Sequence, residues 1–240
     1  IKDMQSTIGD ELYKLSQKKK YNNFLSLLFD IKTKTSCNKT SLDILIKLDY
    51  FSDFGDINYL LNCVKLYDKF IGKGNFGKTH RKQFNKKTYD DLHPIFQEAV
   101  DKFTTEKSKN GSTIYVSEKN IYKMVLYLSH KIKYKPTTLV QHAQYEAEIL
   151  NYVSTIDKNS DEWIVTNVEI NQYGTPYVSL YRLCDGYSNV YKTNKKWYNE
   201  YKIDVGDSIK PFFEEKRKKV KEDNKWVDTN ETYIMLSEWA

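Results

Sequence analysis

The first two thirds of the chain carry apolar residues at helical spacing. In residues 21–31 (YNNFLSLLFDI) the apolar side chains recur every three or four positions, which places them on one face of a helix. The same spacing predicts further helices over residues 38–48, 57–67, 90–107, 117–132 and 137–154. The stretch DYFSDFG, at residues 49–55, interrupts the pattern. We therefore expect a helix, a tight turn and a second helix around this stretch.

From residue 163 onward the pattern changes to short alternating segments, which are typical of strands. The expected strands cover residues 163–170, 175–183, 187–193, 208–215 and 232–239. Gly174, Gly186 and Gly206 lie in turn-forming sequences between them. Short strands with turns at close spacing predict a small barrel. The pattern as a whole predicts an α+β chain, with a helical region over residues 1–157 and a strand-rich domain over 158–240.

The basic residues are clustered, which bears on the kind of partner. The chain has 38 Lys and Arg against 32 Asp and Glu, a net charge of +6. Dense clusters lie at Lys18–Lys20, within residues 73–87 and within residues 216–221. Such clusters bind phosphate backbones, although a lysine-rich chain also forms solvated surfaces of this kind. The 20 tyrosines favour nucleic acid, because aromatic rings interleaved with cations suit single strands.

Other functional classes lack their usual signals. The three cysteines, Cys37, Cys63 and Cys184, stand far apart and outside C-x-x-C spacing, so we expect no metal site and a reducing, cytoplasmic location. No apolar run approaches the roughly 20 residues of a membrane helix, so we expect no membrane partner. The sequence begins at Ile1 rather than Met, and we expect it to be part of a longer chain.

The stretch GKGNFGKT, at residues 72–79, fits both the P-loop and the dinucleotide fingerprint. Both patterns require a buried strand before the glycines and a packed helix after them. Here the preceding residues have helical spacing and the following ones, HRKQFNKK, are polar and basic. We therefore expect no nucleotide cofactor, and a basic connector that is either a solvent linker or a contact for phosphates. The cations of this connector are Lys73, Lys78, Arg81 and Lys82.

Two segments, in order, resemble one family. CNKTSLDILIKLDYFSDFGDINYLL, at residues 37–61, resembles a region of bacterial replicative DNA polymerase III α subunits in which a helix-hairpin-helix lies behind the fingers. YEAEILNYVS, at residues 145–154, is similar to the helix that leads into the OB domain of that family, with Asn151 where the family usually has glycine. The strand-rich tail lies where the OB domain of the family would lie. The order of these features extends over nearly the whole chain.

This resemblance implies a fold and a function. The fold is a helical region with a helix-hairpin-helix, followed by a five-stranded OB-fold β-barrel. The implied function is the non-catalytic, DNA-binding portion of a replicative polymerase, with duplex primer-template and single-stranded DNA as partners. The sequence lacks paired, strand-borne aspartates for two Mg²⁺ ions, so we expect no catalytic residues and no metal or other cofactor in this piece, although the parent chain would be a DNA-directed DNA polymerase. The Gly-x-Gly hairpin of the preceding family motif is missing, since Asp3-Met4-Gln5 replaces it.

Candidate DNA contacts follow from these features. At the turn near residues 49–55 we expect contacts from backbone N–H groups and nearby lysines, at Lys39, Lys47, Phe54 and Gly55. Packing of the Phe54 ring in the core is the alternative. On the barrel, strand alternation puts tyrosines on a face where bases stack, and Lys195 follows in the next connection. The stacking candidates are Tyr177, Tyr181 and Tyr191, and covering the sheet is the alternative for all of them.

A docking function remains as a second hypothesis. The chain would then bind a sliding clamp or loader subunit, or another replisome subunit, as its partner. The clamp-binding peptide of the family has its nearest counterpart at residues 97–103 (QEAVDKF). That segment matches poorly and has the spacing of an ordinary amphipathic helix.

Overall fold

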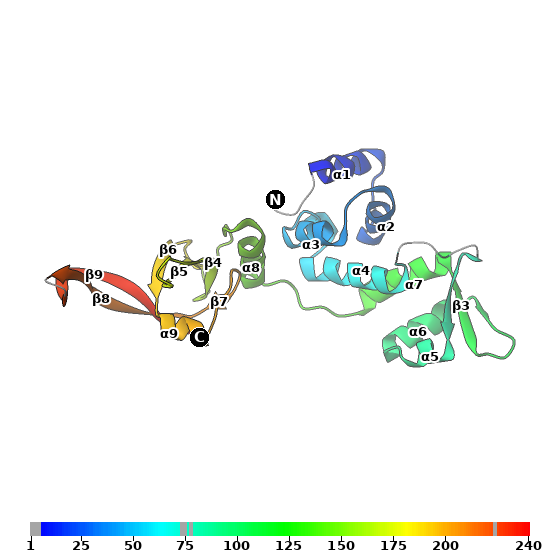
Figure 1. The fold of residues 1–240 in the computed structure, drawn as a ribbon. Helices are drawn as coiled ribbons and strands as arrows, with labels where there is room; N and C mark the ends of the chain where they lie inside the picture. The colour runs from blue at the N-terminus through cyan, green and yellow to red at the C-terminus, as the bar shows by residue number, and fades with distance from the viewer. Residues whose placement is uncertain (1–5, 73–75, 77–78, 223–224) are drawn as a thin grey trace. The chain divides into compact units, whose positions relative to one another are not determined.

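The computed structural model describes residues 6–72, 76, 79–222 and 225–240. Contacts between residues divide the chain into two compact units, one ending at Pro136 and the other running from Thr137 to Ala240. The fold is α+β, with a helical unit first and a unit built on a curled sheet second (Figure 1).

The helical unit begins with a run of helices and one short 3₁₀ turn, and several of these helices have side-chain caps. They are α1 (Ser6–Lys18), α2 (Phe24–Lys34), α3 (Lys39–Lys47), the short 3₁₀ turn η1 (Ser52–Phe54) and α4 (Ile57–Phe70). Asn23, Asn38 and Asp56 each accept a backbone N–H in the first turn of α2, α3 and α4, which satisfies donors that the helix itself cannot pair. The apolar faces predicted by the spacing form the core, where Leu28, Ile46, Leu60 and Phe70 are fully buried.

A small sheet follows α4 and is absent from the predicted pattern. It consists of β1 (Arg81–Asn85), β2 (Glu106–Lys107) and β3 (Thr113–Ser117), in the antiparallel order β1-β3-β2. The remaining helices of this unit are α5 (Lys86–Asp90), α6 (Pro94–Phe103) and α7 (Glu118–Lys131). The helix predicted over residues 90–107 is thus shorter, because Thr104 caps α6 and the chain turns into β2. Only Phe84, Ile114 and Val116 of this sheet are buried, and burial alternates only within the five residues of β3, which is too short a pattern to stand out in the sequence.

The second unit consists of α8 (Leu139–Leu150) and a six-stranded mixed sheet that curls into a half-barrel. Its elements are β4 (Trp163–Ile170), β5 (Pro176–Arg182), β6 (Ser188–Thr193), α9 (Lys195–Glu200), β7 (Ser208–Ile209), β8 (Pro211–Glu222) and β9 (Lys225–Trp239). The strand order is β7-β4-β5-β6-β9-β8, with β6 parallel to β9 and every other pair antiparallel. The strands at the two ends of this order, β7 and β8, are consecutive in sequence and are separated by Lys210. The sequence pattern predicted them as one strand.

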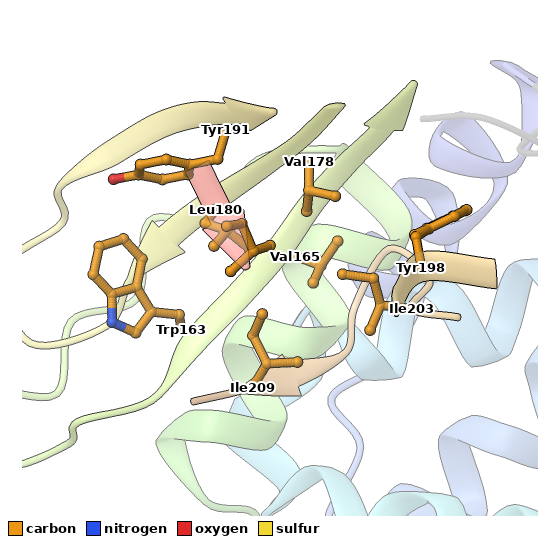
Figure 2. Close-up of a cluster of buried hydrophobic side chains, with 9 residues drawn as sticks. Trp163, Val165, Val178, Leu180, Tyr191, Tyr198, Ile203 and Ile209 are labelled. Carbon is orange, nitrogen blue, oxygen red and sulfur yellow. The ribbon is translucent and has the colours of Figure 1, made fainter. Parts of the chain in front are cut away.

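The curled sheet has an apolar cluster inside it. Trp163 and Val165 of β4, Leu180 of β5 and Tyr191 of β6 face one another there (Figure 2). Ile209 of β7 completes the group from the end of the strand order. The curl of the sheet removes these side chains from water, which favours the closed arrangement.

A second apolar cluster lies on the opposite face of β4 and β5, under α8. Ala143 and Ala147 of α8 are fully buried against Ile164 and Leu183. Their small side chains let the helix approach the sheet closely. This packing joins α8 to the second unit, whereas the predicted boundary near residue 158 placed that segment with the helical region.

Candidate nucleic-acid interface

The turn between α3 and α4 is held by aromatic packing. Phe51 is buried, with its ring 5.5 Å from that of Phe24, and the half-buried Phe54 ring lies 6.2 Å from Phe24. Gly55 has φ 139° and ψ −176°, a conformation almost restricted to glycine. A Cβ there would also lie 2.8 Å from Cδ1 of Tyr59. Phe54 and Gly55 are therefore explained by the construction of the turn.

The backbone donors of this turn are used inside it. The N–H of Phe54 donates to the carbonyl of Phe51 at 2.9 Å, and that of Gly55 donates to Ser52 at 3.1 Å. Of the predicted lysines, Lys47 pairs with Asp43 at 3.2 Å, while Lys39 is exposed at the start of α3. The exposed amine of Lys39 therefore remains accessible to a phosphate at this turn. The N–H groups of Phe54 and Gly55 are already hydrogen-bonded within the turn.

The described cations of the basic connector have structural partners. Arg81 lies 4.0 Å from the centre of the Tyr115 ring and donates to Glu106 at 2.8 Å. Lys82 donates to the carbonyls of Lys69 at 2.9 Å and Phe70 at 2.6 Å, which closes the C-terminal end of α4. Burial, with a smaller contribution from Lys69, lowers the pKa of the Lys82 ammonium. Both side chains are engaged in holding β1 in place.

The other predicted residues of this connector, Lys73 and Lys78, lie outside the described residues. The segment before them is the helix α4, and His80 and Arg81 after them lead into strand β1. This is the reverse of the strand-then-helix order that a P-loop requires.

Two of the predicted stacking tyrosines are buried. The Tyr181 hydroxyl donates to the carbonyl of Thr155 at 3.0 Å, and its ring belongs to the cluster under α8. The Tyr191 ring lies inside the half-barrel, 4.6 Å from the ring of Phe213 and 6.4 Å from that of Trp163. Neither ring is available to a base in this structure. Tyr191 faces the interior and its neighbour Val190, which is 58% exposed, lies on the outer face of β6, since successive side chains of a strand point to opposite faces.

A short stripe of aromatic and basic side chains does lie on the outer face of the sheet. Half-buried Tyr177 of β5 stands opposite Lys192 of β6, and Lys192 stands opposite Met235 of β9. The Lys192 amine lies 5.4 Å from the centre of the Tyr233 ring, which also comes from β9. We call Tyr177, Val190, Lys192 and Tyr233 the outer stripe. It alternates rings and an apolar side chain with a cation across three neighbouring strands, which is the arrangement that base stacking uses.

The outer stripe leads into a hollow at the long β8–β9 hairpin, which extends away from β4, β5 and β6 (Figure 1). The hollow has a volume of about 630 Å³. It is lined by Lys192, Glu215, Lys216, Arg217, Lys218, Lys219, Trp226, Asp228 and Tyr233. Trp226 is 68% exposed. Cations therefore predominate in the hollow and an exposed indole lies beside them.

Acidic neighbours neutralise part of this charge. Lys216 pairs with Glu214 at 2.5 Å, and Lys218 pairs with Glu231 at 2.8 Å. Lys219 pairs with Asp228 at 3.5 Å. These pairs are exposed, so each contributes little stability and can exchange for a phosphate at small cost.

The other predicted barrel lysine lies by a neighbouring turn. Lys195 is exposed at the start of α9, and its amine would be 2.8 Å from a Cβ placed on Gly174 in the β4–β5 turn. Tyr173, in the same turn, is 76% exposed. The predicted residues that the structure leaves accessible on this unit are thus Tyr177 and Lys195. Sequence reasoning missed Lys192 and Tyr233, because the parallel pairing of β6 with β9 joins residues that are distant in the sequence. It also missed Trp226, which lies on β9 and lines the hollow.

Within the described residues, no cluster of three or more His, Cys, Asp or Glu side chains is arranged to hold a metal ion. Within the same residues, none of the helices has both the length and the apolar character needed to cross a membrane. A scan of family models, a search of curated proteins and a search of solved structures each found no match.

Proposed function

We propose that this chain is a non-catalytic, nucleic-acid-binding portion of a replicative DNA polymerase, and that it holds single-stranded DNA along the outer stripe. The observation that carries the proposal is the juxtaposition of Tyr177, Lys192 and Tyr233 on three adjacent strands, beside a cation-rich hollow. Rings of this kind stack on bases of any sequence, and the cations neutralise the backbone. Contacts with duplex primer-template belong to the same proposal.

The connectivity of the sheet supports an OB-type barrel. In our interpretation β4, β5 and β6 are its first three strands, β7 and β8 together form the fourth, and β9 is the fifth. Three features support this assignment: the parallel pairing of β6 with β9, the helix α9 between the third and fourth strands, and the pairing of β7 with β4. OB domains bind oligonucleotides on the face of strands two and three, which here carries Tyr177 and Lys192.

The residues on which the polymerase resemblance rests have clear structural roles. Asn38 caps α3, and Gly55 occupies a conformation that needs glycine. Asn151 ends α8 in the left-handed region at φ 57°, where glycine is the commonest residue and asparagine a frequent substitute. Glu146 accepts hydrogen bonds from Ser154 across the end of the same helix. These roles support a shared fold with that family, and they leave the DNA contacts to the outer stripe.

The experiment is a fluorescence anisotropy titration of a labelled dT oligomer over a series of salt concentrations. The expected result is salt-dependent binding, with a log–log slope of about −0.7 for each phosphate neutralised. Tyr177→Ala should weaken binding by about 1–3 kcal/mol, as for the loss of one stacked base. Tyr152→Ala is the matched control, because Tyr152 is an exposed tyrosine of the same unit outside the outer stripe. A flat salt response, or equal losses for the two variants, would overturn the proposal.

A further inference from the structure

The helical unit carries an apolar groove between α2 and α7. The groove has a volume of about 370 Å³. It is lined by Lys19, Asn23, Leu25, Ser26, Phe29, Tyr122, Lys123 and Leu126. The Phe29 and Tyr122 rings meet edge to face, with their centres 5.3 Å apart. This aromatic contact forms the floor of the groove, and the volume of the groove accommodates bulky apolar side chains.

The rim of the groove is positive. Its lining includes Lys19 and Lys123 and contains no acidic residue. Lys123 is exposed on α7, and no ion pair of Lys123 occurs within the described part of the chain. A ligand that fits here has an apolar body and negative charge at its ends.

The positive rim continues into a neighbouring hollow that also includes Lys19. This second hollow contains Lys14, Lys18 and Lys34 and two acids, Glu11 and Asp30. Both acids are already engaged within the unit. Glu11 accepts hydrogen bonds from the N–H and hydroxyl of Ser36. Asp30 accepts from Tyr21 at 2.8 Å, pairs with Lys34 at 2.8 Å and lies 3.9 Å from the amine of Lys19, whose side chain stays 56% exposed.

The uncommitted charge beside the groove is therefore cationic. Lys14 and Lys18 make no ion pair within the described residues, and Lys18 lies in the last turn of α1. A chain segment seated in the groove would pass these amines, and acidic side chains along that segment would meet them.

We propose that this groove binds an acidic, amphipathic peptide segment of a partner protein. The Leu or Phe side chains of the peptide lie on the floor formed by Phe29 and Tyr122, beside Leu25 and Leu126. Its Asp and Glu side chains lie against Lys19 and Lys123. This groove lies on the helical unit and shares no residue with the outer stripe, so the two proposals can be tested separately.

The test uses the full chain and a fluorescein-labelled peptide in which Leu and Phe alternate with pairs of Asp and Glu. Binding is measured by anisotropy for the wild type, Lys123→Glu, Leu126→Ser and Lys65→Glu. Lys65→Glu is the matched control, because Lys65 is an exposed helical lysine of the same unit that does not line the groove. A second peptide with Lys in place of Asp and Glu controls for non-specific adsorption.

We expect Lys123→Glu to raise the Kd of the acidic peptide by at least about fivefold, because the substitution places like charges together, and Lys65→Glu to leave it unchanged. Leu126→Ser should also weaken binding, and the basic peptide should not bind. Equal affinity of Lys123→Glu and Lys65→Glu would overturn the proposal, as would equal binding of the two peptides. Displacement of the acidic peptide by a dT oligomer would assign these lysines to nucleic acid and would also overturn it.

Discussion

Replacement of Glu146 tests how α8 is joined to the segment that follows it. Glu146 is 7% exposed, and its carboxylate accepts three hydrogen bonds from the segment that follows the helix. The donors are the N–H of Ser154 at 2.9 Å, the Ser154 hydroxyl at 2.6 Å and the N–H of Thr155 at 2.9 Å. Glu146→Gln keeps one acceptor oxygen in place of two and removes the charge.

The expected loss follows from these contacts. The glutamine oxygen can retain both backbone N–H bonds, but these become neutral, and each weakens by about 1 kcal/mol. The hydroxyl of Ser154 can reorient to accept from the new amide, so its bond largely survives. Glu146→Gln should therefore destabilise the second unit by about 2 kcal/mol.

The assay is urea denaturation followed by tryptophan fluorescence. All four tryptophans, Trp163, Trp197, Trp226 and Trp239, belong to the second unit, so their emission reports on that unit alone. Glu238→Gln is the control, because Glu238 is an exposed glutamate of the same sheet. Equal unfolding midpoints for the two variants would refute the reasoning.

The pH dependence of the same measurement gives an independent check. Burial alone would raise the pKa of Glu146, but the hydrogen bonds from Ser154 and Thr155 outweigh it, and the pKa in the folded state is lowered from 4.5. Stability from this group is therefore fully present above pH 4.5 and is lost as the pH falls through the lower folded value. Glu146→Gln should lose less stability than the wild type over this acid range, and parallel pH profiles would contradict the assignment.

Substitutions at three further positions test other parts of the structure. Gly55→Ala should destabilise the helical unit by about 1–3 kcal/mol through backbone strain. Unfolding of this unit is followed by far-UV circular dichroism, while the unfolding curve from tryptophan emission should stay unchanged. Unchanged stability of the helical unit would contradict the strained turn. Asn151→Gly should be close to neutral, whereas Asn151→Ala should destabilise the second unit by about 1 kcal/mol, because the left-handed conformation is unfavourable for alanine. Equal urea midpoints for the two variants would contradict this role of Asn151. Gly206→Ala should destabilise the second unit, because a Cβ would lie 2.5 Å from Cγ of Glu148 and φ at this position is 96°. A urea midpoint equal to that of the wild type would contradict this role of Gly206.

The local parts of this structure could be read from the sequence. The spacing of Phe24, Leu28 and Ile31 specifies the buried face of α2, and the strand at residues 163–170 matches β4. These features depend on neighbours within a few positions. The small sheet was missed because its strands are mostly polar and its β1–β3 pairing spans the intervening helices α5 and α6.

The candidate site was harder to predict because it depends on contacts between distant strands. Alternation correctly separates Tyr177 from Val178, but it cannot say which face a helix will cover, and α8 covers Tyr181. Tyr191 was assigned to the outer face, yet the interior of the half-barrel needs its ring to fill space beside Phe213. Lys192 and Tyr233 meet only because β6 and β9 pair, which no local pattern encodes.

The central claim is that single-stranded DNA lies along the outer stripe. The most direct measurement is a ¹H–¹⁵N NMR titration of the full chain with a dT oligomer of about 12 nucleotides. The account predicts shift changes concentrated at Tyr177, Val190, Lys192 and Tyr233, continuing along the β8–β9 hairpin towards Trp226. Shift changes confined to the helical unit, or no changes at low salt, would contradict it.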